Sequence, residues 1–391
     1  MHPAGSKDNY DAVIVGARVA GAATALLLAR RGHRVLVVDQ DRPGRDTLST
    51  HALMRPGVVQ LQRWGLLDAV VATGAPPVRR VTFRYSENAV PIDLDEPLYA
   101  PRRTVLDPIL VAAAEDAGAE FAFGVRVDGV MRDADGRVTG VRGRGRGGGP
   151  FKASAATTIG ADGRNSLIAR RVDARVTRTR TATGPMLYGY WSGVETSDYE
   201  WCYNLGTGAG LIPTNDGLVC VTASGPPARF HEMRADRLAA LHRIIAATNA
   251  DVAQRVAAGQ RVSPIRGFAG LVGRMRRPWG PGWALVGDAG YFKDPLTAHG
   301  MSDALRDAEL LALALDAVRT DRASEAAALS RYERVRDELS IALFDVTARI
   351  ASYDWSLAEL QVQHRLLSAA IQHETRVLSE LDGAQLAAAA T

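Results

Sequence analysis

Apolar residues near the start of the chain recur in a pattern that predicts a strand, a helix and a second strand. Residues 12–15 form a continuous apolar run, which is typical of a strand buried on both faces. An Ala- and Leu-rich stretch, 20–31, follows and stops at Gly32, as helices often do. Residues 34–38 repeat the buried-strand pattern and end in Asp39. The pattern predicts a βαβ unit and therefore a parallel sheet.

The turn inside this unit is a glycine turn with one departure from the dinucleotide-binding pattern. Gly16 and Gly21 match the first and last glycines of G-x-G-x-x-G, but Arg18 stands at the middle one. This geometry puts a pyrophosphate on the helix N-terminus and a ribose hydroxyl on Asp39. Arg18 could turn its side chain outward or pair with a phosphate oxygen. The alternative is an α/β start that binds no nucleotide.

The middle of the chain has the alternation of a partly exposed sheet. Residues 78–96 alternate apolar and polar side chains, as in a hairpin. Between 185 and 270, short apolar runs are broken by Gly, Pro and Asn-Asp-Gly, which predicts an antiparallel sheet. Its strands are expected near residues 186–194, 199–205, 209–213 and 217–223.

Two further buried strands end in a glycine–acid turn. Residues 156–159 lead into a turn that contains Asp162, and an apolar run from Trp283 leads into Gly287-Asp288. After Asp288 comes a loop and then a helix that begins near Met301, so a carboxylate and free N–H groups are expected at one place. Other helices are expected at 108–117, 304–318, 329–350 and 356–381, the last an amphipathic helix that could cap a cavity, join a partner subunit or simply pack.

Composition narrows the class of protein. The 391 residues carry a net charge of +4, which suits an anionic cofactor but is too small for a nucleic-acid-binding surface. The alternating Arg and Gly at 142–149 lack aromatic residues and are expected to form a solvated loop. Two cysteines, no apolar run long enough to span a membrane and no signal-peptide pattern at 1–10 predict a cytoplasmic protein with reduced thiols.

The three glycine–acid motifs, at 16–21, 160–166 and 286–305, occur in an order that identifies a family. The chain resembles FAD-dependent monooxygenases of the aromatic-hydroxylase (para-hydroxybenzoate hydroxylase-like) fold, and also the neighbouring geranylgeranyl-reductase-related oxidoreductases, over about residues 10–350. The resemblance implies an α/β fold: a Rossmann-like FAD-binding domain with an inserted antiparallel β-sheet substrate domain and C-terminal helices. The expected segments are 8–77, 101–180 and 271–340 for FAD, 78–100 and 181–270 for substrate, and 341–391 for the helices.

The resemblance implies FAD as the cofactor and NAD(P)H as its reductant. Asp39 would hold the adenosine ribose, Asp288 would accept a hydrogen bond from the ribityl chain, and Val127 would meet the adenine through its backbone. The Gly300 and Met301 N–H groups would face the N1–C2=O edge of the flavin, where the reduced ring carries negative charge. The implied cofactor contacts are Gly16, Ala17, Arg18, Gly21, Asp39, Arg103, Val127, Asp162, Gly287, Asp288, Pro295, Gly300 and Met301.

The resemblance also suggests where a substrate would bind. The inserted sheet would cover the flavin, so its aromatic residues are cavity candidates, although aromatics in a sheet are commonly core: Tyr188, Tyr190, Trp191, Trp201 and Tyr203. His51 and His299 are candidates for a general base, with a role in shaping the loops as the alternative. Lys293 is a third candidate, and flavin chemistry requires no covalent catalyst from the protein.

Several activities fit these expectations. The leading one is an NAD(P)H-dependent monooxygenase that hydroxylates an electron-rich, aromatic or polyketide-like small molecule with O₂ through a flavin C4a-hydroperoxide. The alternatives are a reductase or dehydrogenase of an unsaturated small molecule, a flavin halogenase, and a flavin-binding scaffold without catalysis. The Tyr-x-Trp-x-Phe-Pro segment of the reductases and the Trp-x-Trp-x-Ile-Pro motif of the halogenases are both missing. The expected partners are the substrate and O₂, with a homodimer possible and neither nucleic acid nor a membrane span involved.

Overall fold

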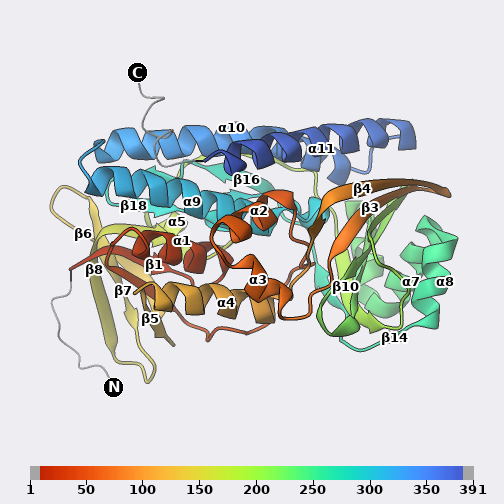
Figure 1. Ribbon diagram of the computed structural model, residues 1–391, viewed down its shortest axis with the longest axis horizontal. Helices are drawn as coiled ribbons and strands as arrows, with labels where there is room; N and C mark the ends of the chain where they lie inside the picture. Colours follow the sequence, from red (N-terminus) through yellow and green to blue (C-terminus); the bar gives the residue numbers. More distant parts are fainter. Residues whose placement is uncertain (1–8, 382–391) are drawn as a thin grey trace.

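The computed structural model describes residues 9–381, and two large sheets dominate it (Figure 1). At the centre of the first sheet, β1 (Asn9–Val15) pairs in parallel with β2 (Val35–Asp39) and β8 (Pro150–Gly160). β1 and β2 are buried on both faces over most of their length, as the continuous apolar runs predicted, whereas β8 is continuously buried only over its last four residues. The sheet is completed by β5 (Glu120–Phe123), β6 (Arg126–Arg132), β7 (Val138–Arg144), β17 (Trp279–Gly280) and β18 (Trp283–Leu285).

Helix α1 (Val19–Ala29) lies against α4 (Arg103–Asp116) and α9 (Gly300–Arg319), so segments almost 300 residues apart meet over this sheet. α1 is buried along nearly its whole length, which explains why its sequence is so rich in Ala and Leu. The prediction that a helix starts at 108 was wrong, because α4 begins at Arg103 and has Pro108 inside it. The Arg103 side chain bonds Asp107 one turn later, which stabilises this early start.

The second sheet carries the hairpin predicted at 78–96 and the four strands predicted between 186 and 223, together with two short strands at 260–261 and 266–268 that were not predicted. Its order is β14-β10-β13-β12-β11-β3-β4, with β15 also on β10. All of its pairs are antiparallel except β3–β11, whose parallel pairing joins the hairpin to the later strands and was not predicted. The strands are β3 (Val78–Tyr85), β4 (Asn88–Leu98), β10 (Met186–Ser192), β11 (Tyr199–Asn204), β12 (Thr207–Pro213), β13 (Val219–Ser224), β14 (Gln260–Arg261) and β15 (Arg266–Phe268).

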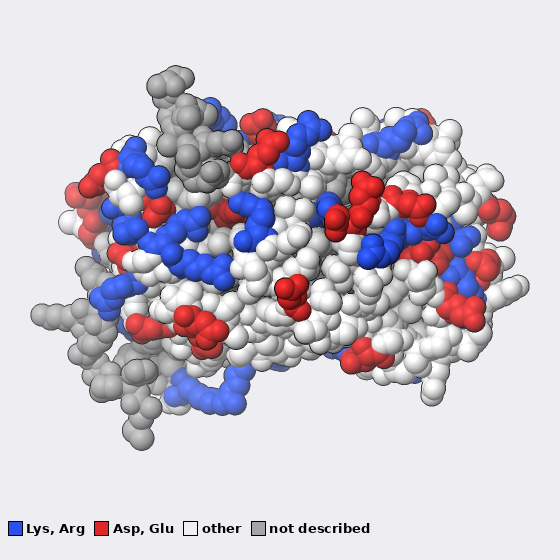
Figure 2. Space-filling model, in the orientation of Figure 1, with Lys and Arg blue, Asp and Glu red and all other residues white. Residues whose placement is uncertain are grey.

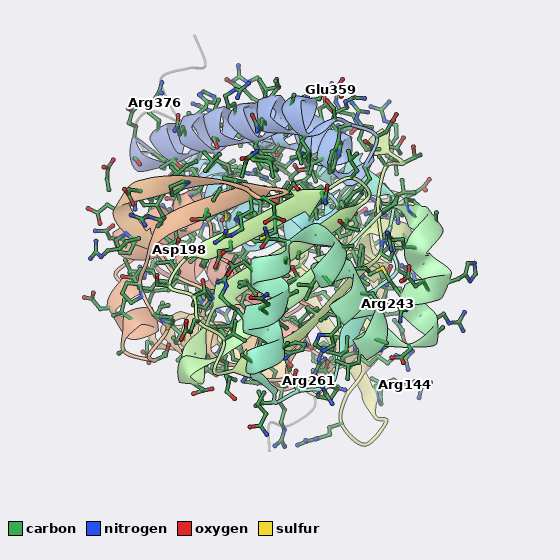
Figure 3. All side chains as sticks on the ribbon, turned by 90° about the vertical axis from the view of Figure 1, so that its right-hand side faces the viewer. Arg144, Asp198, Arg243, Arg261, Glu359 and Arg376 are labelled. Atoms are coloured by element: carbon green, nitrogen blue, oxygen red, sulfur yellow. The ribbon has the colours of Figure 1, made fainter. Side chains whose placement is uncertain are left out.

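Helices α6 (Phe230–Ala235), α7 (Arg237–Thr248) and α8 (Ala250–Ala258) follow the last long strand and were also missed by the sequence analysis. They share a buried apolar cluster with one face of the second sheet. Figure 3 shows them in front of the strands, with Arg243 of α7 at the surface. The opposite face of the sheet is therefore the one that faces the rest of the molecule.

The C-terminal helices α10 (Glu325–Ala351) and α11 (Leu357–Ser379) run along one side of the molecule (Figure 1). Ser356 and Glu359 form a capping box at the start of α11. The C-terminal helical segment was predicted to begin at residue 341, which is wrong because residue 341 lies in the middle of α10. Residues 382–391 of the same predicted segment lie outside the described part of the chain. Shorter elements are α2 (Arg55–Arg63), α3 (Leu67–Val71), α5 (Leu167–Arg171) and a third sheet of β9 (Val176–Arg180), β16 (Gly273–Arg276) and β19 (Tyr291–Phe292).

The helices, the surface charges and the cysteines can be compared with what the composition predicted. Across residues 9–381, none of the helices combines the length and the apolar character that crossing a bilayer demands. On the face shown in Figure 2, basic and acidic side chains are interspersed, which is unlike the single-sign surface of a nucleic-acid-binding protein. Cys202 and Cys220 are both buried and free.

Candidate functional site

A cavity of about 800 Å³ runs along the ends of β1, β2 and β8 and reaches the second sheet. This is within the size range of cofactor sites, and it lies outside the carboxyl ends of parallel strands, where α/β sheets bind ligands. Ten of the predicted cofactor residues line it: Gly16, Arg18, Asp39, Arg103, Val127, Asp162, Asp288, Pro295, Gly300 and Met301. Ala17, Gly21 and Gly287 are not among the residues that line it.

The glycine turn at the end of β1 is built for close packing. Gly16 has a φ of +108°, and a Cβ there would lie 2.5 Å from the Ala161 carbonyl oxygen. A Cβ at Gly21 would lie 1.8 Å from the carbonyl oxygen of Gly16. The Ala17 N–H donates to the Asp39 carboxylate at 2.7 Å, which fixes the two ends of the predicted nucleotide unit to each other. Only glycine fits at both positions, and this leaves the start of α1 open to a ligand.

Arg18 occupies the middle of this turn without disturbing it. Its side chain is 34% exposed and lies along the cavity, with a guanidinium nitrogen 3.3 Å from the Arg45 carbonyl oxygen and 3.8 Å from the Asp107 carboxylate. Arg103 holds the same carboxylate in a bidentate pair at 2.7 and 3.0 Å. Two guanidinium groups therefore share one buried carboxylate, which leaves excess positive charge on this wall and suits a pyrophosphate.

The second motif lies directly beside the glycine turn, since a Cβ at Gly16 would lie 3.2 Å from the Asp162 nitrogen. The Asp162 carboxylate accepts hydrogen bonds from the Ser166 hydroxyl at 2.5 Å and from the Leu167 N–H at 2.6 Å. Burial nevertheless raises the pKa of Asp162. These bonds shape the start of α5, so the structural role that the sequence left open is present, and the residue also faces the cavity.

Asp288 is the half-buried carboxylate of the third motif. It lies at the end of β18, where burial, followed by the negative charge of Asp303, raises its pKa to about 6, against the opposing effect of Lys293. No residue between 9 and 381 donates a hydrogen bond to it, which leaves its acceptors available to a ligand hydroxyl. Gly287, with a φ of +57°, donates its N–H to Asp307 at 3.1 Å and lets the chain pass close to Ala20 of α1.

Helix α9 begins at the cavity with Gly300, and Met301 lines the wall beside it. The preceding Ala298 has a φ of +51°, an unfavourable conformation for a non-glycine residue, and such conformations cluster at functional loops. The first N–H groups of a helix have no partner inside it. The helix start therefore offers donors and a positive dipole end to a ligand in the cavity.

A fully buried cluster of charges lies behind this helix start. Arg306 contacts Asp307 at 2.8 Å and both Asp303 and Glu374 at 3.0 Å, and Lys293 pairs closely with Asp303. Burial alone would raise the pKa of Glu374, but His299, at 2.6 Å, and Arg306 reverse the direction and lower it. His299, Asp303 and Glu374 have the spacing of metal ligands, yet these carboxylates are already paired with Lys293 and Arg306.

The two histidine candidates lie behind the cavity wall, whereas Lys293 lines it. His51 is fully buried, has a φ of +63° and hydrogen-bonds the Tyr190 hydroxyl. Burial, and then Arg103 and Arg102, lower the pKa of His51 to about 3. The structure thus brings His51 and His299 to loops that border the site, where they hold Tyr190 and Glu374.

The aromatic substrate candidates divide by the face of the sheet on which they lie. Tyr188 lines the large cavity, and Tyr190 lies on the same face, behind His51. The prediction for Trp191 was wrong: it packs against His242 of α7 on the other face, because successive strand residues point to opposite sides. Trp201 and Tyr203 line a separate, small pocket.

Sequence reasoning missed several residues of the lining. Met186 and Thr50 line both the large cavity and the small pocket, and Phe268, Phe292 and Arg164 line the large cavity. Alternation along β10 could have pointed to Met186, since it lies two residues before Tyr188. The loop residue Thr50 carried no such signal.

The chain matches a family of known proteins. A family model described as "FAD binding domain" matches residues 9–347. The chain belongs to this family. The predicted fold class, the flavoprotein resemblance and FAD as cofactor are therefore confirmed, whereas NAD(P)H, O₂, a homodimer and a cytoplasmic location stay predictions.

Relatives of this FAD-binding protein carry different activities in their names. A probable electron transfer flavoprotein-quinone oxidoreductase of Escherichia coli is 37% identical over 42% of this chain, which is only 39% of that relative's length. A menaquinone reductase of Mycolicibacterium smegmatis is 29% identical over 77% of this chain and 75% of its own. The prediction of a flavin-dependent oxidoreductase agrees with these names.

Solved structures extend the likeness over the whole fold. A probable FAD-dependent monooxygenase from Pseudomonas aeruginosa has a TM-score of 0.75 and 25% identity, and covers 93% of this chain and 100% of its own. The flavin-dependent brominase Bmp2 has a TM-score of 0.81 at 18% identity and covers 95% and 94%. At that identity, the brominase supports the fold alone.

Proposed function

We propose that this protein is a flavin-dependent oxidoreductase that acts as a monooxygenase, with NAD(P)H as reductant and an electron-rich, aromatic or polyketide-like small molecule as substrate. The observation that carries the proposal is the continuity of the large cavity. It starts at the glycine turn and Asp39, passes Asp288 and the start of α9, and ends at Tyr188, next to the small pocket.

The residues fit bound FAD by their chemistry. Gly16, Arg18 and Arg103 would hold the pyrophosphate, and Asp39 would accept from the adenosine ribose in exchange for its bond to Ala17. Asp288, a carboxylate without a donor among residues 9–381, would accept from the ribityl chain. Val127 would meet the adenine, and Asp162 would remain with its turn.

Bound FAD supplies the electron transfer and the oxygen activation, and the protein supplies position and electrostatics. The Gly300 and Met301 N–H groups would stabilise negative charge on the ring without a charged side chain. The second sheet would exclude water from the reacting atoms and orient the substrate. His51, His299 and Lys293 stay candidates for roles in proton transfer or positioning.

A reductase of a quinone-like or other unsaturated substrate is the second candidate, because the menaquinone reductase matches three quarters of both chains. The two readings differ in their products. The FAD-reconstituted protein is first reduced without air by NADPH or NADH, and the flavin absorption bands are followed. In one experiment air and phenol are then added. In the other a soluble quinone is added and air is kept out. A hydroxylated product supports the monooxygenase, whereas quinol formation without oxygen overturns it in favour of the reductase.

Asp288→Ala tests the assignment of the cofactor site. The variant should lose one hydrogen bond to the ribityl chain, which predicts weaker FAD retention by about tenfold or more. Its far-UV circular dichroism should match that of the unmutated protein. Unchanged FAD retention in a folded variant would refute the assignment.

A further inference from the structure

A small, enclosed pocket adjoins the large cavity on the second sheet. Its volume is about 10 Å³, room for no more than one water molecule. The same three residues, Thr50, Met186 and Pro295, line both spaces, so they separate the pocket from the cavity. A substrate ring can enter this pocket only if one of its walls moves.

Three of the nine residues that line the pocket are held by their own contacts. A Cβ at Gly210 would lie 3.2 Å from the Trp201 ring, so this ring already rests on the strand. Tyr203 packs on His364 and Trp355, with ring centroids 4.9 and 6.2 Å apart. The Ser224 hydroxyl accepts a hydrogen bond from Tyr353 at 2.7 Å.

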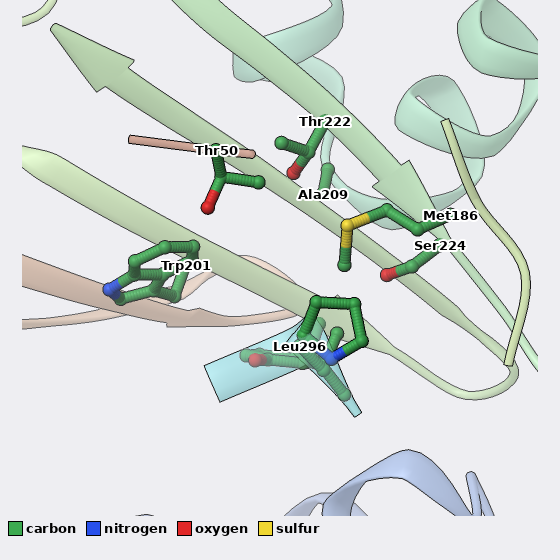
Figure 4. A pocket seen from close by; sticks show the side chains of 9 residues that line it. Thr50, Met186, Trp201, Ala209, Thr222, Ser224 and Leu296 are labelled. Carbon is green, nitrogen blue, oxygen red and sulfur yellow. The ribbon is translucent and has the colours of Figure 1, made fainter. Parts of the chain in front are cut away.

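Met186 is the wall best able to move. Figure 4 shows its thioether extending into the space between Trp201, Ser224 and Leu296. Methionine is unbranched, and its rotamers differ little in energy, so its side chain adapts to irregular spaces. Its backbone is held by pairing on both sides, to Ser224 of β13 and Phe268 of β15, so only the side chain is free to swing.

The chemistry of the pocket selects the ligand. None of the nine residues that line it is charged, and an ion buried there would lack a partner. Because Ser224 accepts from Tyr353, its own hydroxyl proton remains available to an oxygen on the ligand. These features fit an uncharged, phenol-like ring that carries an oxygen.

We propose that Met186 is a specificity-determining residue: its side chain closes the small pocket and swings aside to admit an uncharged phenolic ring from the large cavity. This inference rests on the proposed function, because the ring would then lie beside the bound flavin. Moving the Met186 side chain to open the pocket uses part of the free energy of binding the phenolic ring. The residue at position 186 therefore determines how tightly such a ring binds.

The test measures phenol binding to the FAD-loaded protein through the change in the flavin absorption spectrum. Met186→Ala removes the moving side chain and should lower the dissociation constant for phenol roughly two- to tenfold. Met186→Ile keeps an apolar side chain but stiffens it, and should raise that constant. Met233→Ala is the matched control, since Met233 is also buried but packs on the other face of the sheet.

A second comparison tests the selection by charge. The unmutated protein should bind 4-hydroxybenzamide more tightly than 4-hydroxybenzoate, which has the same size but carries a carboxylate. Equal binding of these two probes would overturn the preference for an uncharged ring. Phenol binding that does not differ among the FAD-loaded unmutated, Met186→Ala and Met186→Ile proteins would overturn the role of Met186. Failure of the unmutated protein to retain FAD would instead refute the proposed function, and the inference with it.

Discussion

Arg306→Met removes the guanidinium that bridges three carboxylates of the buried charge cluster, Asp303 and Asp307 of α9 and Glu374 of α11. Arg306 is 0% exposed and contacts Asp303, Asp307 and Glu374 at 2.8–3.0 Å. Removing one partner of a buried ion pair leaves uncompensated charge and typically costs about 3–5 kcal/mol. Methionine approximates the length of the arginine stem, so loss of charge dominates the effect. We expect the free energy of unfolding to fall by about this amount at pH 7.

Urea unfolding, followed by tryptophan fluorescence and circular dichroism, measures the effect. The matched control is Arg322→Met, which removes a 2.7 Å pair with Asp316 from a side chain that is 45% exposed, and should cost less than about 1 kcal/mol. Without Arg306 the carboxylates hold protons more readily, so its loss should cost less at pH 4 than at pH 7. A loss no larger than that of Arg322→Met, or one that does not vary with pH, would refute the reasoning.

Two further predictions concern the cofactor site. Asp288 has a folded-state pKa of about 6 against an ordinary value of 3.8, so its ionisation destabilises the FAD-free protein by about 3 kcal/mol as pH rises from 3.8 through 6. Above pH 6, the free energy of unfolding of FAD-free Asp288→Asn should therefore exceed that of the FAD-free unmutated protein. Below pH 4 the two values should be equal, and urea titrations of both proteins at the two pH values check this. Gly16→Ala should abolish FAD retention, because the new Cβ would clash with Ala161. The flavin content after gel filtration measures this, and a fully flavin-loaded variant would contradict it.

Local patterns in the sequence predicted the parts of the site that depend on short-range geometry. The turn from Gly16 to Gly21, the acid at Asp39 and the strand-end Asp288 each follow from a strand, a turn and a helix next to each other in the chain. The helix that begins at Gly300 and the four strands between 186 and 224 were likewise predicted to within a few residues. In each of these cases, the residues that set the local structure are close together in the chain, so a short stretch of sequence is enough to predict it.

The contacts that were not predicted join residues far apart in the chain. His299 and Glu374 are 75 residues apart, and nothing near either one signals their 2.6 Å contact. The face of the second sheet on which the Trp191 side chain lies depends on the strand register. A shift of one residue in that register would move every side chain of the strand to the other face. Helix α7 packs on β10, β11, β12 and β13, which come earlier in the chain, so its place in the fold depends on contacts outside its own segment.

The parallel pairing of β3 with β11 has a consequence for the order in which the chain can fold during synthesis. Val81 pairs with Tyr199, 118 residues later, so the β3–β4 hairpin leaves the ribosome long before its neighbour exists. At about 5–20 residues per second, it waits roughly 6 to 24 s with one edge unpaired. Unpaired strand edges are templates for association with other chains. We therefore expect nascent chains that stall between 98 and 199 to be the form of this protein that depends most on chaperones.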